Sequence, residues 1–143
     1  MKQLTFWEED KLSEFRPIKY WSVRSQNKNL VPNVPVVFLN YLINRRGQIY
    51  SKLSDKILTQ TKRDYDPYIY AYIKIFNQNY NTRFSLHRLV ACTFVECFDK
   101  KTYNFVDHID GNKINNHYLN LRWVTNSQNQ LARYTNINQL DIL

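Results

Sequence analysis

The stretch from residue 103 to residue 129 restricts the possible folds more than any other part of the chain. Its two short strand-like runs, 103–108 and 121–124, are separated by a polar segment that contains the tight-turn sequence Asp110-Gly111-Asn112. Thr125 and Gln128, which follow the second run, have the spacing of a helix capping box. The pattern therefore predicts a strand, a long turn, a second strand and a helix.

An antiparallel hairpin is predicted further upstream. Residues 36–39 and 41–43 are apolar runs typical of strands, and residues 48–51 form another. Between them lies Asn44-Arg45-Arg46-Gly47, in which Asn and Gly flank two arginines. We expect Gly47 to supply the positive φ that a tight hairpin turn requires.

Residues 68–76 alternate with the period of a strand. One predicted face is aliphatic and the other carries tyrosines and a lysine; the two sets are Ile69, Ala71, Ile73 and Ile75, and Tyr68, Tyr70, Tyr72 and Lys74. The aliphatic face is predicted to be core. Two interpretations of the tyrosine face stay open, namely packing against a neighbouring element or contact with nucleic acid.

A helix is predicted from residue 86 to about residue 98, capped by Ser85. Its apolar stripe consists of Leu86, Leu89, Val90, Phe94 and Cys97. Cys92 and Cys97 both fall within this helix, and two cysteines are too few for a four-thiolate zinc site. We expect free thiols and no zinc.

The whole pattern predicts an α+β protein: a small antiparallel β module followed by the strand–turn–strand–helix unit. We divide the chain into an N-terminal extension of unknown role (1–36), a β-rich module (37–83), the unit that contains the motif (84–135) and a tail (136–143). Within the extension, Thr5 and Glu8 have capping-box spacing, whereas Pro32 and Pro35 favour extended or looping chain. A chain of 143 residues suits one compact domain.

The charge balance favours a polyanionic partner. Lys and Arg outnumber Asp and Glu by 20 to 12, a net charge of +8, and each cation set against a phosphate releases counterions. A merely basic protein remains the alternative. Acidic residues lie where a signal peptide would be apolar, and we expect a soluble, intracellular protein. The many Asn, Tyr, Ile and Lys residues suggest an AT-rich genome, such as that of a phage or virus.

Residues 106–129 closely resemble the HNH nuclease motif, in the form found in phage intron-encoded homing endonucleases. The resemblance rests on the pair Asp107-His108, the turn 110–112, the segment Asn120-Leu121-Arg122-Trp123, and Thr125 four residues before Asn129. The helix sequence 86–91 and the hairpin 41–51 also match, so that the likeness covers about residues 37–130. It implies a ββα-metal fold and a DNA endonuclease that leaves 5′-phosphate and 3′-hydroxyl ends.

The residue types suit that chemistry. His108 is the predicted general base, because a neutral imidazole near pH 7 can take a proton from water. Asp107 and Asn129 are predicted oxygen ligands for one Mg²⁺ or Mn²⁺ ion. The resemblance gives Asn120 the task of holding the base in place. Neighbouring strand residues point to opposite faces, so Asp107 and His108 can share a site only if the strand ends or twists there.

Several residues have plainer interpretations. Asp110, Asn112, Asn115 and Asn116 are predicted turn formers, His117 a surface or structural residue, and Trp123 part of the core. His87 is predicted to be structural or to contact phosphate. Candidate DNA contacts are Arg45, Arg46, Lys74, Arg83, Arg88, Lys113 and Arg122, with Arg88 and Arg122 expected to matter most. An inactive DNA-binding module is the alternative function, and the chain could form a homodimer.

Overall fold

The computed structural model describes residues 14–23, 28–76 and 78–132, and within them three antiparallel sheets surround one α-helix, α2 (Leu86–Phe94). The sheets have the strand orders β1-β2-β3-β4, β5-β6-β7 and β8-β9. The strands are β1 (Arg16–Tyr20), β2 (Val36–Ile43), β3 (Ile49–Ser51), β4 (Lys56–Ile57), β5 (Thr61–Lys62), β6 (Ile69–Ile73), β7 (Thr82–Ser85), β8 (Phe105–His108) and β9 (Leu121–Val124). A short 3-10 helix, η1 (Tyr118–Asn120), precedes β9, and residues 126–132 are helical. The predicted α+β class is confirmed.

The N-terminal strand β1 is part of the core, although its residues fall in the segment that we predicted to be an extension of unknown role. It pairs antiparallel with β2, with an irregularity in register between Pro17 and Ile18. Ile18 and Tyr20 are buried, and the Tyr20 ring lies 4.8 Å from that of Phe84 on β7. The β1 strand therefore helps to hold the first two sheets together.

The predicted hairpin joins β2 to β3. The buried side chain of Asn44 holds the turn, because its Oδ1 accepts hydrogen bonds from the backbone N–H groups of Arg46 and Gln48, at 3.1 and 2.9 Å. Gly47 has φ of +89°, as the sequence predicted, and a Cβ added there would lie 3.2 Å from Leu86 Cδ2 on α2. The hairpin turn thus packs directly against the central helix.

Gly47→Ala is expected to lower the free energy of unfolding by about 1–2 kcal/mol, because alanine is strained at positive φ and the new methyl group crowds Leu86. Urea unfolding of the two proteins would measure the difference. Arg46→Ala in the same turn is the control, and we expect a change within about 0.5 kcal/mol since its ion pair with Glu14 is exposed. Equal stability of Gly47→Ala and the unmutated protein would contradict this description of the turn.

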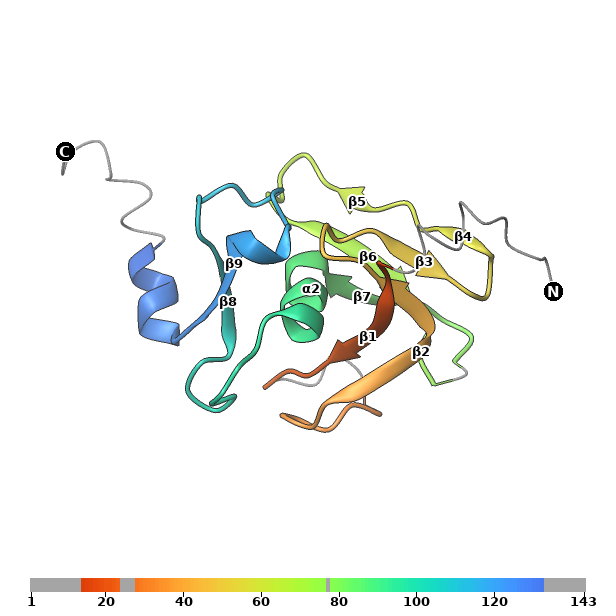
Figure 1. The fold of residues 1–143 in the computed structure, drawn as a ribbon, viewed down its shortest axis with the longest axis horizontal. Helices are drawn as coiled ribbons and strands as arrows, with labels where there is room; N and C mark the ends of the chain where they lie inside the picture. Colours follow the sequence, from red (N-terminus) through yellow and green to blue (C-terminus); the bar gives the residue numbers. More distant parts are fainter. Residues whose placement is uncertain (1–13, 24–27, 77, 133–143) are drawn as a thin grey trace.

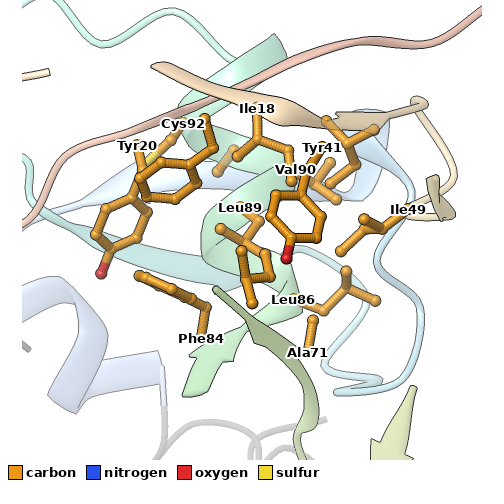
Figure 2. Close-up of a cluster of buried hydrophobic side chains, with 14 of the residues drawn as sticks. Ile18, Tyr20, Tyr41, Ile49, Ala71, Phe84, Leu86, Leu89, Val90 and Cys92 are labelled. Carbon is orange, nitrogen blue, oxygen red and sulfur yellow. The ribbon is translucent and has the colours of Figure 1, made fainter. Parts of the chain in front are cut away.

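Side chains from both larger sheets converge on α2. Figure 2 shows Leu86, Leu89 and Val90 at the centre of this cluster, and Figure 1 shows the β8–β9 hairpin on the other side of the helix. The cluster also contains Ile18, Tyr20, Tyr41, Ile49, Ala71, Phe84 and Cys92. Because α2 contacts strands of all three sheets, it fixes the position of the hairpin relative to the rest of the protein.

Two details of the predicted helix were wrong. Ser85 occupies the N-cap position, but its side chain makes no capping hydrogen bond, because the residue is also the last of β7 and pairs with Tyr70. The helix ends at Phe94, and extended backbone at Val95 leaves Cys97 outside it. Cys92 and Cys97 are both free, and Cys92 is buried.

The alternating stretch 68–76 contains β6, which is shorter than the predicted strand. The predicted core face is confirmed, because Ala71, Ile73 and Ile75 are buried and Ile69 is half-buried. The predicted capping box of Thr5 and Glu8 and the tail from residue 136 lie outside the described residues. Among the helices that the structure describes, none has the length and apolar character to cross a membrane.

Candidate active site

The C-terminal unit has the predicted order of strand, turn, strand and helix. β8 and β9 pair antiparallel, with Asp107 opposite Arg122 and His108 opposite Leu121. The predicted capping box is confirmed, because Thr125 N donates to Gln128 Oε1 at 3.0 Å and Gln128 N donates to Thr125 Oγ1 at 3.1 Å. Helix 126–132 therefore begins directly after β9. The first strand starts at Phe105, two residues later than predicted.

Asp107 and His108 are both buried, with 4% and 2% of their surface exposed, and both line a cleft of about 530 Å³. We name it the Asp107 cleft; its other lining residues are Tyr103, Ile109, Arg122, Trp123, Val124, Gln128, Leu131 and Ala132. The two neighbours can share it because β8 ends at His108 and the chain turns at Ile109. The strand end that the sequence required is present.

The carboxylate of Asp107 is paired with Arg122. Arg122 donates from Nε at 2.9 Å and Nη2 at 2.8 Å, and both bonds reach the same oxygen, Oδ2. No other hydrogen bond to this carboxylate is found among the described residues, so Oδ1 is left without one. The Arg122 side chain is 54% exposed, in contrast with the buried carboxylate. Arg122 therefore supplies the positive charge at this site instead of standing free on the surface.

The imidazole of His108 is held by one hydrogen bond and by two neighbouring rings. Its Nε2 lies 2.8 Å from Oδ1 of Asn116, a residue that is itself buried. The His87 ring lies 5.1 Å from it, centre to centre, and Tyr68 6.3 Å. Burial lowers the pKa of His108 below its usual value of 6.5. The nearby Lys113 also lowers it, and the hydrogen bond to Asn116 Oδ1 acts in the opposite direction. The ring is thus kept neutral at pH 7.

His87 packs between two rings of this site. Its ring centre lies 5.1 Å from those of both Tyr68 and His108. Burial lowers the pKa of His87 to about 3, and the adjacent His108 contributes in the same direction. A histidine that stays neutral at every ordinary pH is a packing partner for His108, which agrees with the structural role predicted from the sequence.

Asn120 closes the long turn but does not touch the His108 ring. Its Nδ2 donates to Asp110 Oδ1 and to the carbonyl of Asn115, both at 2.9 Å, and its Oδ1 accepts from Asp110 N at 3.1 Å. Its own carbonyl accepts from Ile109 N, the residue after His108. The resemblance implied that Asn120 holds the base; the structure gives it only an indirect part in this.

Asn116 is the residue that forms a hydrogen bond with the ring, although its place in the sequence predicted only a turn former. No local pattern marks it, because its buried position depends on how the turn folds back over β8. The other predicted turn formers behave as expected: Asp110, Asn112 and Asn115 hydrogen-bond within the turn. His117 is structural, since its Nδ1 accepts a hydrogen bond from Leu119 N at the start of η1.

Asn129 is not among the residues that line the Asp107 cleft. It lines a second cleft of about 630 Å³, which we name the Asn129 cleft, together with Arg83, His87 and Arg88. Its remaining lining residues are Tyr68, Tyr70, Thr82, Ser85, Phe105 and Val106. The structure thus brings Asp107 and His108 together, whereas Asn129 is placed in the neighbouring cleft.

The Asp107 cleft offers the chemistry that a hard divalent cation needs. Magnesium sites commonly take one or two carboxylates from the protein and fill the other positions with water and phosphate oxygens. Asp107 supplies a carboxylate oxygen without a hydrogen bond, in a cleft large enough for such partners. Within the described ranges, no group of three or more His, Cys, Asp or Glu side chains is arranged to hold a metal. The site therefore fits a cation held mainly by Asp107.

Arg88, predicted from the sequence to be a leading phosphate contact, makes hydrogen bonds within the fold. Its guanidinium donates three hydrogen bonds to backbone carbonyls, two to Trp21 and one to Asn104, at 2.7 to 3.1 Å. It also lies over the rings of Trp21 and Trp123, which stack on each other with centres 4.5 Å apart. Arg88 thus ties β9 to the chain just after β1. Trp123 packs against the core, as predicted.

The other predicted DNA contacts remain accessible to a partner. Arg45 and Arg46 are exposed in the β2–β3 turn, and the guanidinium of Arg45 lies over Tyr118 at 5.4 Å. Arg83 lies over the ring of Tyr70 at 4.5 Å, and Lys113 lies 5.8 Å from the ring of Tyr68. Cations therefore follow the tyrosine face of β6. The set is completed by the exposed Lys74 and by the half-buried Arg63, which donates to the Tyr72 hydroxyl.

The comparisons with known proteins agree with this geometry. Residues 104–131 match the family model described as HNH endonuclease. An uncharacterized HNH endonuclease of Acanthamoeba polyphaga mimivirus is 42% identical over 92 residues, 64% of this chain and 26% of that protein. The DNA endonuclease I-HmuI of Bacillus phage SP01 is 40% identical over 100 residues, 67% of this chain and 54% of that protein.

A solved structure of the HNH homing endonuclease I-HmuI, which describes DNA binding and cleavage by that protein, superimposes with a TM-score of 0.55. The sequences are 37% identical there, and the match covers 67% of this chain and 54% of that one. The fold and the Asp-His pair at a strand end thus define a nuclease motif of the HNH class. Residues 104–131 belong to the HNH endonuclease family, and the chain is similar to phage homing endonucleases of that family. It spans about half the length of I-HmuI.

Proposed function

We propose that this chain is a metal-dependent HNH DNA endonuclease that nicks or cuts double-stranded DNA. The observation that carries the proposal is the shared cleft of Asp107 and His108, where a carboxylate oxygen and a neutral imidazole lie at the end of one strand. Hydrolysis of a phosphodiester needs a base for the attacking water and positive charge near the phosphate. His108 serves as the base, and Arg122 adds charge beside it.

One Mg²⁺ or Mn²⁺ ion per site is part of this proposal, held by Asp107, and no zinc is involved. Bound there, the cation stabilises the charge that develops on the phosphate and on the leaving 3′ oxygen. HNH nucleases are generally dependent on divalent metals. Asn129 is the second ligand that the resemblance implies, and it lines the neighbouring cleft together with His87, whose ring packs against that of His108.

We propose that the DNA backbone lies along the cations of the hairpin turn, the β5–β6–β7 sheet and the long turn. Arg45 and Arg46 contact it from the hairpin turn, Lys74 and Arg83 from the β5–β6–β7 sheet, and Lys113 from the long turn. Three of these cations, Arg45, Arg83 and Lys113, lie over aromatic rings, which supports an ordered role in binding. Since the relatives compared above are viral or phage proteins, we place the activity in the host cytoplasm.

Supercoiled plasmid is expected to be nicked or linearised by the protein in the presence of Mg²⁺ or Mn²⁺, and to stay intact when EDTA removes the metal. T4-type DNA ligase should reseal the nicks, because it requires the predicted 5′-phosphate and 3′-hydroxyl ends. Parallel reactions with Zn²⁺ test the metal preference, and gel filtration with and without DNA tests for a homodimer.

Cleavage that persists in EDTA would contradict the metal-dependent mechanism. Absence of cleavage on any DNA, with binding retained and falling steeply as salt is raised, would favour the alternative of an inactive DNA-binding module. Absence of both cleavage and binding would contradict both functions.

A further inference from the structure

The hydrogen bond between His108 and Asn116 determines where the proton of the imidazole lies. His108 Nε2 is 2.8 Å from Asn116 Oδ1, and both side chains are buried. An amide oxygen can only accept a hydrogen bond, so Nε2 must carry the hydrogen. A neutral imidazole has a single N–H, and its other nitrogen, Nδ1, is then left with the lone pair.

We propose that Asn116 is a positioning residue that fixes His108 as the Nε2–H tautomer and leaves Nδ1 as the atom that accepts a proton from water. This inference rests on the proposed function, in which His108 is the base, and assigns the accepting atom and the residue that selects it. Among the described residues no hydrogen bond is found at Nδ1, and His108 lines the Asp107 cleft, where the proposed function places the attacking water.

The unsatisfied half of the Asn116 amide argues against a purely structural role. Its Nδ2 is buried and has no hydrogen-bond partner among the described residues. A buried donor without a partner costs about 1–3 kcal/mol, and an apolar residue of similar size would avoid that cost. The unpaired Nδ2 therefore lowers the stability of the folded protein. The Oδ1 atom of the same amide makes one hydrogen bond, with His108.

The surroundings restrict both partners of this contact. His87 packs against the His108 ring at 5.1 Å, so that the ring cannot turn freely. On the other side, the carbonyl of Asn115 accepts a hydrogen bond from Asn120 Nδ2, which fixes the backbone next to Asn116. Asn120 thereby contributes indirectly to holding the base, because it fixes the backbone next to Asn116.

The test combines nitrogen NMR of the histidine rings with cleavage kinetics. Asn116→Leu removes the acceptor at similar volume, Asn116→Asp keeps an oxygen acceptor, and Asn115→Leu is the control, since it breaks a hydrogen bond to Asp110 in the same turn without touching His108. Ring ¹⁵N shifts of His108, assigned by comparison with His108→Gln, report the tautomer in the absence of DNA and metal.

In the unmutated protein we expect a protonated Nε2 and an unprotonated Nδ1 in His108. Asn116→Leu should mix the two tautomers and lower kcat by about 10- to 100-fold, as loss of an orienting partner commonly does, with KM changed less than about twofold. Asn116→Asp should keep the tautomer and restore most of kcat. Asn115→Leu should leave the tautomer unchanged.

Protonation of Nδ1 in the unmutated protein would overturn the proposal, because Asn116 would then be turned so that its Nδ2 donates to the ring. An unchanged tautomer or an unchanged kcat in Asn116→Leu would also overturn it. The tautomer is measured without DNA or metal, so a protein that fails to cleave plasmid contradicts the proposed nuclease function while the NMR result still decides whether Asn116 selects the tautomer.

Discussion

His108→Ala is expected to lower the rate of DNA cleavage by about 10²- to 10⁴-fold, the range typical for loss of a general base. The imidazole is the titratable group in the Asp107 cleft that is neutral and can accept a proton at pH 7. Affinity for DNA should change little, because the residue is buried and binding depends on the exposed cations. Single-turnover cleavage of plasmid and a DNA-binding titration would measure the two quantities.

His117→Ala is the matched control, since His117 lies in the same motif but only accepts a hydrogen bond from Leu119 N. We expect it to cleave within a few-fold of the unmutated rate. Because loss of a buried ring leaves a cavity, circular dichroism and thermal unfolding must show that His108→Ala is folded. A folded His108→Ala that cleaves normally would contradict the assignment of the base.

The lowered pKa of His108 also gives the cleavage rate a defined pH dependence. Only the neutral imidazole accepts a proton. Burial lowers the pKa of His108 below 6.5, the usual value for histidine, so that the ring is still mostly neutral at pH 6.5. The rate should therefore stay level as the pH falls through 6.5 and decline only at more acidic values, once the ring is protonated in the folded protein.

The elements of this fold could be predicted where the relevant interactions are local. The alternation of apolar and polar residues predicted the core face of β6, and the turn residues Asn44 and Gly47 predicted the β2–β3 hairpin. The capping box of Thr125 and Gln128 marked the helix after β9. Each of these signals lies within a few residues of the structure that it specifies, and none depends on a distant segment.

Some contacts could not be predicted, because only the folded chain brings the partners together. Arg88 binds the carbonyl of Trp21, 67 residues away, so nothing around Arg88 indicated that its charge is used inside the fold. β1 could not be predicted for the same reason, because residues 21–35 separate it from its partner β2. Asn116 lies eight residues after His108, but only the folded turn shows that it reaches the ring.

The second large effect is expected at Asp107. Asp107→Asn should lower cleavage in Mg²⁺ by about 10²-fold or more, because a metal that stabilises the transition state supplies several kcal/mol and each 1.36 kcal/mol is a factor of ten. The amide is almost the same size as the carboxylate, so the variant should fold. Thermal unfolding with increasing Mn²⁺ gives a second measurement: the metal should raise the Tm of the unmutated protein and leave that of Asp107→Asn unchanged.

Arg122→Gln removes the positive charge that is paired with Asp107 and leaves Asp107, the proposed metal ligand, in place. Without Arg122 the buried carboxylate has no counter-ion, and we expect a loss of about 1–2 kcal/mol in the metal-free protein, a modest figure because the guanidinium is half exposed. The double variant Asp107→Asn/Arg122→Gln should recover most of that stability. If Asp107 binds the cation, Mn²⁺ supplies the missing charge and should restore the Tm of Arg122→Gln. An equal response to Mn²⁺ in Asp107→Asn and in the unmutated protein would show that the metal binds elsewhere, and the assignment of Asp107 as ligand would be wrong.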